Sequence, residues 1–363
     1  MDKLIGITNF VDMTRTITLL LLAVMAPALL HAQGGTAPAI VPEPAHIQMA
    51  KGSLRAGGAV FKCDPGIDSL SLGAIRRFAA RLSLVSGRTS SVSTPIGLQS
   101  VVADGSVKGF VFLRDGSLAK GGYSISIGHK AALIRSGSTE GFLNAVQTLK
   151  QMLPEAIYGE KVSEKEKWSL PCCEISDRPE SAERGLRLDS SSEFWSVEKI
   201  MGLLDDMAKY KFNSLLWHIA DSDGWRMEVR AYPLLAQVAG YRMESSGRYG
   251  GYYSQEDIAR MVRYAESLGI SIIPELSIGG RIVSDSELRP AGTQPEAFLR
   301  QIMKETARMF PGGTVSLSDE EYPDAEGVLS AYGKSAAAEA VLVWPEVKPG
   351  EAGRIGELSE KVW

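Results

Sequence analysis

The sequence predicts an α/β protein in which helices cover a parallel β-sheet, with a small α+β domain ahead of it. Two observations lead to this prediction. From about residue 177 onward, short apolar strands alternate with amphipathic helices, which is the pattern of repeated βα units. Before residue 170, short alternating strands dominate and helices are few. The length of 363 residues fits two domains, since ~100–200 residues per domain is usual.

The α+β domain is expected over residues 38–170. Within it, the segment GYSISIG places Tyr123, Ile125 and Ile127 on one face of a strand, and a turn with a second short apolar stretch follows. The next segment, STEGFLNAVQTLKQML, carries apolar residues at helical spacing. Hairpins with one or two helices indicate an α+β fold.

The βα region is expected over residues 177–363. Its first helix has Ser196 as N-cap, its second helix has Ser254 as N-cap and ends at Gly269, and its third helix has Pro295 in the first turn. The strands between these helices are short and mostly apolar; their segments read RGLRLDS, NSLLWHIAD, ISIIPEL and TVSL.

A doubly wound sheet and a (β/α)8 TIM-type barrel both fit this alternation. Polar residues gather at the carboxyl ends of the predicted strands, which favours the barrel because barrel sites are built on that rim. The residues concerned are Asp189, His218, Asp221, Glu275, Asp319 and Glu320. Residues 177–363 fall short of the ~200–250 residues of a complete barrel, so we expect the barrel to be incomplete at its C-terminus.

Composition excludes several classes of function. The net charge of −4 provides no basic face, so nucleic acid is not an expected partner. Only four histidines are present, which argues against a histidine-rich metal centre, and no metal or cofactor is expected. Three cysteines leave at least one thiol free and indicate no disulfide framework, although one bridge involving Cys63 stays open.

Residues 1–32 are typical of a secretory signal peptide. Arg15 precedes an apolar run over residues 17–30, and Ala32 provides a small residue for cleavage. The run is shorter than a comfortable membrane span, so we expect an exported protein without a membrane anchor after processing. Met13 is an alternative start that would give a more usual charged segment.

The octet SLSDEEYP places three acids after an apolar strand. On its own it fits a solvated turn, but at the end of the fourth strand it would bring Asp319 and Glu320 into the barrel mouth and turn Glu321 outward. Pro323 is consistent with a break in strand geometry just after Asp319.

Three segments resemble the family-20 glycoside hydrolases, the β-N-acetylhexosaminidases. The segment RGLRLDSSSEFWSVEKIMGLLDDMAKYKFNSLLWHIADSDGWRMEVRAYP is similar to the first third of the catalytic barrel. GGYYSQEDIARMVRYAESLGISIIPEL continues the similarity, and MFPGGTVSLSDE brings Asp319-Glu320 to the position of the family's catalytic Asp-Glu pair. The resemblance covers roughly residues 38–363, because the first domain resembles the α+β domain that precedes these barrels.

The resemblance implies exo-acting removal of terminal β-linked N-acetylhexosamine, GlcNAc or GalNAc, from glycans. The mechanism it implies is retaining and substrate-assisted, with the 2-acetamido oxygen of the substrate as nucleophile. Glu320 would protonate the leaving oxygen and then act as base toward water. Asp319 would hold the acetamido N–H and stabilise its developing positive charge. A carboxyl beside another carboxylate in a partly dry mouth has a raised pKa, which suits an acid catalyst.

The resemblance also implies a set of substrate-binding residues. An arginine of the first strand would grip sugar hydroxyls with its donor fork, and tryptophans would wall the pocket. The arginine, the histidine and the tryptophans each have a structural alternative. The arginine could form a structural ion pair, and the histidine and the tryptophans could be core residues. The residues implied are Arg184, His218, Asp221, Glu275, Trp344 and Trp363.

Three segments and one single position differ from the family's usual sequence, and they keep a second interpretation open. Ser191-Ser192-Glu193 stands in place of Ser-Arg-His, and residues 277–281 replace Asp-Met-Pro-Gly-His. Residues 315–318 replace His-Ile-Gly-Gly, and Ser222 replaces an aspartate. The alternative is a non-catalytic or truncated relative that binds amino-sugar glycans. A third interpretation is a divalent cation bound by Asp319, Glu320 and Glu321.

Overall fold

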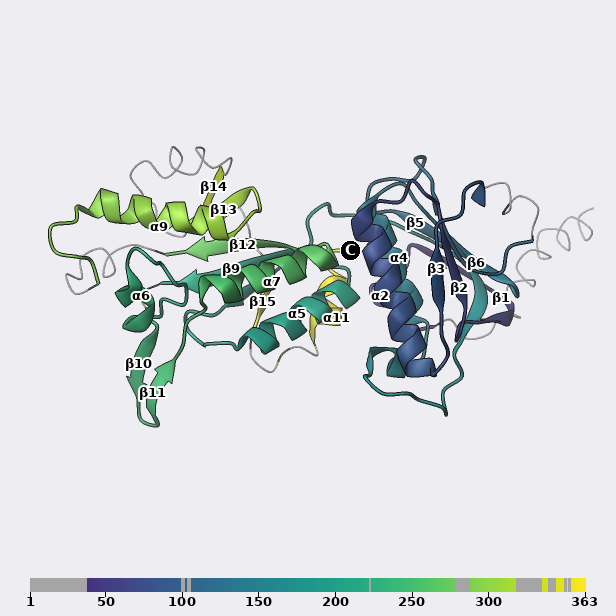
Figure 1. Ribbon diagram of the computed structural model, residues 1–363, viewed down its shortest axis with the longest axis horizontal. Helices are drawn as coiled ribbons and strands as arrows, with labels where there is room; N and C mark the ends of the chain where they lie inside the picture. The colour runs from purple at the N-terminus through teal and green to yellow at the C-terminus, as the bar shows by residue number, and fades with distance from the viewer. Residues whose placement is uncertain are drawn as a thin grey trace, which may run out of the picture.

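The computed structural model shows an N-terminal domain built on a mixed sheet and a second domain built on a parallel sheet (Figure 1). It describes residues 38–98, 102, 106–221, 223–277, 288–317, 335–338, 344–348, 351 and 354–363. No helix in these ranges is long and apolar enough to cross a membrane.

Seven strands form the N-terminal sheet, in the order β1-β7-β5-β6-β4-β2-β3. The β5–β6 pair is the antiparallel hairpin that the sequence predicts, whereas β2–β4 and β4–β6 pair in parallel. Parallel pairs need crossover connections, which the hairpin prediction did not include. The strands are β1 (His46–Arg55), β2 (Val60–Cys63), β3 (Ser91–Ser93), β4 (Gly109–Arg114), β5 (Tyr123–Ile127), β6 (Ala131–Ser136) and β7 (Ser169–Asp177).

Helices α2 (Ser69–Ser86) and α4 (Thr139–Gln151) pack against this sheet, and a short 3-10 turn, η1 (Glu155–Tyr158), follows α4. The side chain of Asp68 caps α2 by accepting hydrogen bonds from two backbone N–H groups, and Gly87 ends the helix in the left-handed conformation, with φ 65°. The α4 segment begins at the Ser138 cap, and its apolar face produces the predicted helix.

Six parallel strands form the second sheet, in the order β14-β13-β12-β9-β8-β15. Strands β8, β9, β12, β13 and β14 are neighbours in the sheet in the same order as in the chain. The last strand of the chain, β15, pairs with the other edge of β8. The parallel sheet was predicted from the alternation of strands and helices. The strands are β8 (Gly185–Asp189), β9 (Ser214–Ala220), β12 (Ser271–Leu276), β13 (Thr314–Leu317), β14 (Ser335–Ala338) and β15 (Glu346–Val347).

The helices of this domain begin and end at the predicted signals. Ser196 caps α5 (Val197–Lys209), and Ser254 forms a capping box with Asp257 at the start of α7 (Gln255–Leu268). Gly269 ends α7 at φ 78°, a conformation that favours glycine. The other elements are α6 (Pro233–Gln237), the hairpin β10 (Tyr241–Glu244) and β11 (Gly247–Gly250), α9 (Pro295–Met309) and α11 (Ile355–Ser359).

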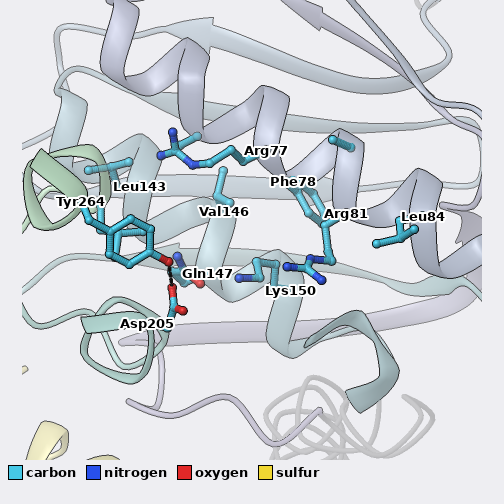
Figure 2. Close-up of a pocket in the computed structure, with 13 residues that line it drawn as sticks. Arg77, Phe78, Arg81, Leu84, Leu143, Val146, Gln147, Lys150, Asp205 and Tyr264 are labelled. Atoms are coloured by element: carbon cyan, nitrogen blue, oxygen red, sulfur yellow. Dashed lines mark hydrogen bonds between the residues drawn. The ribbon is translucent and has the colours of Figure 1, made fainter. Parts of the chain in front are cut away.

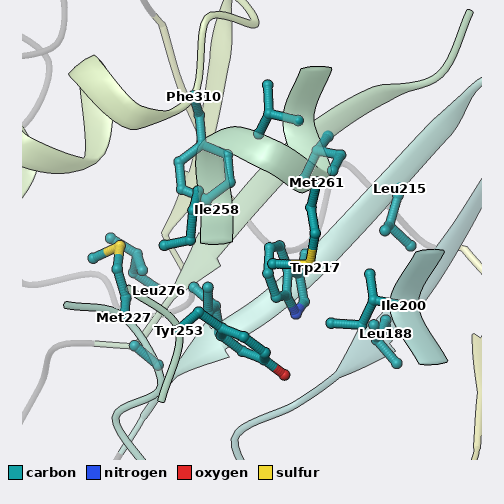
Figure 3. Close-up of a cluster of buried hydrophobic side chains, with 14 of the residues drawn as sticks. Leu188, Ile200, Leu215, Trp217, Met227, Tyr253, Ile258, Met261, Leu276 and Phe310 are labelled. Atoms are coloured by element: carbon teal, nitrogen blue, oxygen red, sulfur yellow. The ribbon is translucent and has the colours of Figure 1, made fainter. Parts of the chain in front are cut away.

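The core of the second domain lies between the sheet and its helices, around Trp217 (Figure 3). The Trp217 ring packs 5.0 Å from the ring of Tyr253, and its indole N–H donates to Ser190 Oγ. All seven residues of β9 are buried. Because successive strand residues face opposite ways, the strand that points Trp217 toward the helices points His218 to the other face of the sheet.

Strands β9 and β12 run away from the N-terminal domain in Figure 1, so that domain lies at the amino end of the parallel sheet. The contacts agree, because Arg184, which directly precedes β8, pairs with Glu140 of α4. A buried ion pair between Lys211 and Asp177 also joins the two domains. The three cysteines carry free thiols and are buried.

Candidate active site

Polar residues form one row across four adjacent strands of the parallel sheet. Asp189 is the register partner of His218, which is in turn the partner of Glu275, and Glu275 is the partner of Ser316. All four lie toward the carboxyl ends of their strands. The sheet therefore presents two carboxylates, an imidazole and a hydroxyl side by side, and we call these four residues the polar row.

His218 lies between two carboxylates. Its Nε2 is 2.9 Å from Asp221 Oδ2, and its Nδ1 is 2.9 Å from Glu275 Oε2. Both ring nitrogens are thus within ion-pair distance of an acid, so the geometry suits a protonated ring. The His218 side chain is only 7% exposed, and Glu275 is fully buried.

A serine connects the two ends of this group of acids. Ser191 Oγ is 2.6 Å from Asp189 Oδ1 and 2.6 Å from Asp221 Oδ2. The hydroxyl of Ser192 donates to the other oxygen of Asp189, and the backbone N–H groups of Asp223 and Gly224 donate to Asp221. Asp189 and Asp221 are therefore held as ionised acceptors by the loops that follow their strands.

Arg187 extends the row toward β15, and sequence analysis missed it. Its guanidinium lies 2.7 Å from Glu275 Oε2 and 2.9 Å from Glu346 Oε2. Residue 187 is two positions before Asp189 and so lies on the same face of β8. The signal that could have revealed Arg187 is a charge inside an apolar, buried strand, because such a charge requires a partner.

The electrostatics of the cluster favour a positive His218 among negative acids. Burial alone would lower the pKa of His218, but Asp221 and Glu275 raise it to about 9, with a further contribution from Asp189. Burial would raise the pKa of Asp221, yet hydrogen bonds from His218 and Ser191 lower it to about 2. The pKa of Glu275 is likewise lowered by His218 and Arg187 against the effect of burial. The raised pKa favours the protonated ring of His218 at neutral pH, and a protonated imidazole is not a general base.

Three buried polar atoms of the row have no hydrogen-bond partner among the described residues. One is His218 Nδ1, which lies within ion-pair distance of Glu275 but makes no well-aligned hydrogen bond. The other two are Glu275 Oε1 and Ser316 Oγ, on neighbouring strands. Buried polar atoms in native proteins are nearly always paired, so unpaired ones at a strand end mark a place for water or a ligand hydroxyl. Among the described residues no cluster of three His, Cys, Asp or Glu could hold a metal ion.

Arg226 builds the loop beside this row, and it too was missed. Its buried guanidinium donates to the carbonyls of Ser190 and Ser191, and also to the carbonyls of Gly240 and Gly251. It thereby ties the turn after β8 to the segments that flank the β10–β11 hairpin. Four carbonyl partners for one guanidinium fix Ser191 where it contacts the acids.

The structure corrects the role predicted for Arg184. This residue precedes β8, at the end of the strand opposite Asp189, and its side chain is 1% exposed. Its guanidinium pairs with Glu140 at 2.6 Å and donates to the carbonyls of Ser181 and Lys211. It forms the structural ion pair that was the alternative, because a residue at the amino end of a strand cannot reach the carboxyl rim.

The two tryptophans also lie away from the polar row. The ring of Trp344 packs on Gly185, the first residue of β8, where a side chain would overlap it. Trp363 packs against the core of the N-terminal domain, and its indole N–H donates to Asp177. Both are thus placed as structural tryptophans at the amino end of the sheet, and not as pocket walls. His218, Asp221 and Glu275 are the predicted binding residues that the structure brings together.

The predicted catalytic pair lies outside the described residues. Asp319, Glu320 and Glu321 follow β13, whose last residue, Leu317, pairs with Leu276 of β12. The strand that leads to the pair is therefore the direct neighbour of the strand that carries Glu275.

Comparison with known proteins decides which family this arrangement represents. Residues 182–292 match the model of glycosyl hydrolase family 20, catalytic domain, and residues 37–178 match the model of glycosyl hydrolase family 20, domain 2. The chain belongs to glycosyl hydrolase family 20. The predicted resemblance is thus confirmed over these two ranges, and the segment MFPGGTVSLSDE lies beyond them.

Curated relatives agree with this assignment, and a solved structure has the same fold. The chain is 28% identical to a beta-hexosaminidase of Vibrio furnissii over 61% of its length and 41% of the relative. It is 28% identical to the N,N'-diacetylchitobiase of Vibrio harveyi over 73% of its length and 29% of the relative. The GH20 beta-N-acetylhexosaminidase structure from Streptomyces coelicolor A3(2) superposes with a TM-score of 0.70 at 24% identity, covering 85% of this chain and 67% of that one. The chain spans less than half the length of these two curated relatives.

One position where this family-20 chain departs from the usual sequence has a visible local role. Ser192, which stands where the family usually has arginine, donates its hydroxyl to Asp189. Its neighbour Ser191 bridges Asp189 and Asp221. The two serine hydroxyls thus hold the carboxylates of Asp189 and Asp221 in place, but they supply no positive charge at the carboxyl end of the sheet.

Proposed function

We propose that this chain is an exo-acting glycoside hydrolase that removes terminal β-linked N-acetylhexosamine from glycans by retaining, substrate-assisted catalysis. The observation that carries the proposal is the polar row at the carboxyl edge of a parallel sheet. Three of its four residues, Asp189, His218 and Glu275, lie in the segment that matches the family-20 catalytic model. A cluster of ionised acids around a buried cation, with unpaired acceptors beside it, suits the recognition of a polyhydroxylated ligand.

We assign the proton transfer to Glu320 and the stabilisation of the substrate's acetamido group to Asp319. The register of β13 against β12 supports this assignment, because the chain leaves β13 beside Glu275 only two residues before Asp319. Two adjacent carboxyl groups repel each other when both are ionised, so one can stay protonated as the acid while the other is ionised.

The role that we assign to His218 is to orient acids and not to transfer protons. Both ring nitrogens lie 2.9 Å from carboxylates, which favours the protonated ring, and a protonated ring has no lone pair to accept a proton. Its positive charge keeps Asp221 and Glu275 ionised and in place.

The proposal is tested by hydrolysis of an aryl N-acetyl-β-glucosaminide by the parent protein, Glu320→Gln and Glu321→Gln. Loss of a general acid lowers the rate by roughly 10²–10⁴-fold, so Glu320→Gln should lose that much. Glu321→Gln, one residue away, is the matched control and should retain the parent rate. Equal rates for the parent and Glu320→Gln would remove Glu320 from this role.

A non-catalytic, glycan-binding relative is the second candidate. It is favoured by Ser192, because a serine whose hydroxyl is engaged by Asp189 leaves the rim without the cation that the family usually places there. A parent protein that releases no chromophore but binds N-acetylglucosamine in calorimetry would support this second candidate against the first.

We also infer that the parallel sheet is a shortened barrel. The described residues contain six of its strands, and β15 pairs with β8 just as the last strand of a barrel pairs with the first. An experimental structure in which residues 177–363 close eight parallel strands would contradict this inference.

Export is the proposed localisation, on the basis of the signal-peptide pattern of residues 1–32. N-terminal sequencing of material secreted by an expressing cell should then begin after Ala32. An intact Met1 on the mature protein would contradict the proposal.

A further inference from the structure

A cavity of about 390 Å³ opens between the two domains, at the amino end of the parallel sheet and away from the polar row. Its walls come from α2 and α4 on one side and from α5 and α7 on the other (Figure 2). The volume falls within the range of small-molecule sites, which are about 300–1,000 Å³. We call this cavity the interdomain pocket.

Three cations line the interdomain pocket against one acid. Arg77 and Arg81 are one helical turn apart on α2, and Lys150 faces them from α4. The acid, Asp205, accepts a hydrogen bond of 2.6 Å from the hydroxyl of Tyr264. Among the described residues no ion pair joins Asp205 to any of the three cations.

The cations have neutral partners in place of carboxylates. Arg77 donates to the carbonyl of Ser267 at 2.5 Å, and Arg81 donates to the carbonyl of Gly159 at 2.6 Å. The Lys150 ammonium lies 4.8 Å from the centre of the Tyr158 ring. Each guanidinium carries five N–H donors, so most of the donors of both arginines stay available.

The charge state of Lys150 shows the effect of this crowding. Burial, with smaller contributions from Arg81, Lys209 and Arg77, lowers the pKa of Lys150 to about 8, and Asp205 acts in the opposite direction. An anion in the pocket would offset this repulsion, since an opposite charge favours the ionised amine. In a chain of net charge −4, the surplus of positive charge here is a local feature that points to an anionic ligand.

The other side chains that line the interdomain pocket indicate what kind of ligand would fit it. Apolar side chains surround the charged groups; they are Phe78, Leu84, Leu143, Val146 and Leu268. The side-chain oxygen of Gln147, which also lines the pocket, is buried and accepts no hydrogen bond. A ligand with an apolar body, an acid group and a hydroxyl would match all three kinds of lining.

We propose that the interdomain pocket binds a small organic anion whose apolar body carries a carboxylate and a hydroxyl donor. The carboxylate lies between Arg81 and Lys150, where two charge-assisted hydrogen bonds hold it. The hydroxyl donates to Gln147, and the body packs on the apolar side chains. Because the pocket joins helices of both domains, an occupied pocket stabilises the domain pair against separation.

The test is a calorimetric titration of the purified full-length chain with 6-hydroxy-2-naphthoate and with its neutral counterpart, 6-hydroxy-2-naphthamide. The two probes share shape and hydroxyl and differ in charge. We expect the carboxylate to bind at least tenfold more tightly than the amide at pH 7. Equal affinities, or no heat from the carboxylate up to millimolar concentration, would overturn the proposal.

Variants locate the binding. Arg81→Gln and Lys150→Met each remove one charged donor and should weaken the carboxylate by roughly tenfold or more. Asp205→Asn removes the opposing acid and should strengthen it by about threefold. Arg260→Gln, an exposed arginine of α7 outside the pocket, is the matched control and should bind as the parent does.

The melting temperature of each variant is measured without ligand, so that a loss of binding can be distinguished from a loss of folding. Should Lys150→Met fail to fold, Asp205→Asn still decides, because tighter binding follows only from the proposed charge pattern. Unchanged affinity in both Arg81→Gln and Asp205→Asn would place the probe elsewhere and overturn the proposal.

Discussion

Lys211 Nζ lies 3.0 Å from Asp177 Oδ2, and neither side chain is exposed to solvent. The ion pair joins the end of β7 to the turn after α5, so it links the two domains across their boundary. Asp177 also accepts hydrogen bonds from the Tyr123 hydroxyl and the Trp363 indole. A buried carboxylate with three side-chain donors is well satisfied, which is the condition under which a buried charge is tolerated.

The first prediction concerns this pair. Lys211→Met leaves Asp177 buried without its cation, and should lower the free energy of unfolding by about 3–5 kcal/mol. Urea unfolding measures the change. The control is Arg260→Gln, which breaks an exposed pair with Glu198 and should cost at most ~1 kcal/mol. Equal losses for the two variants would contradict a stabilising role for the interdomain pair.

The second prediction concerns the pH dependence of stability. The pKa of His218 is raised from 6.5 to about 9, so its contribution is complete below pH 6.5 and is lost as the pH rises through 9. The pKa of Asp221 is lowered from 3.8 to about 2, so its contribution is complete above pH 3.8 and is lost as the pH falls through 2.

His218→Asn should therefore destabilise the protein more at pH 6 than at pH 10, as measured by urea unfolding at both values. A His218→Asn loss that is the same at both pH values would contradict a pKa of His218 that is raised on folding.

The third prediction separates the two roles considered for Arg184. Since its guanidinium pairs with Glu140 and lies at the amino end of β8, Arg184→Gln should lower the melting temperature. It should leave the KM for an aryl N-acetyl-β-glucosaminide within about twofold of the parent value, because lost binding contacts would raise KM. A large rise in KM with unchanged melting would restore Arg184 to the sugar site.

The fourth prediction concerns Gly185. A methyl group at this position would overlap the ring of Trp344, so Gly185→Ala should destabilise the protein by about 1–3 kcal/mol, or more. The control is Gly202→Ala in α5, where no atom lies nearby and alanine favours the helix by roughly 0.5–1 kcal/mol. Opposite shifts of the two melting temperatures would confirm both placements.

Local signals accounted for most of the fold. Ser196, Ser254 and Gly269 mark helix ends by interactions within a few residues, so the sequence shows them directly. The partners of Arg187 could not be found this way, because Glu275 and Glu346 lie 88 and 159 residues further along the chain. Only the curvature and register of the sheet bring them together.

Only part of the candidate site could be predicted, because local sequence does not show contacts between distant residues. His218, Asp221 and Glu275 sit at strand ends, and the register of parallel strands aligns such positions. Arg184 and Trp363 carry side chains of the right type for sugar binding, but residue type does not reveal which end of the sheet a side chain occupies. Their contacts with the N-terminal domain set that placement.

The pairing of β15 with β8 also has a consequence for the order of folding. Two contacts form only after residues 345 and 363 have been synthesised. They are the hydrogen bond from the backbone N–H of Arg187 to the carbonyl of Pro345 and the hydrogen bond from the Trp363 indole to Asp177. The N-terminal sheet, in contrast, contains all its strands by Asp177 and can fold on the ribosome first. Until β15 has been synthesised, the β8 edge of the parallel sheet has no partner strand. Strand pairs that are so far apart in the sequence form slowly. During that interval β8 is an unpaired strand edge, and such an edge can pair with the wrong segment.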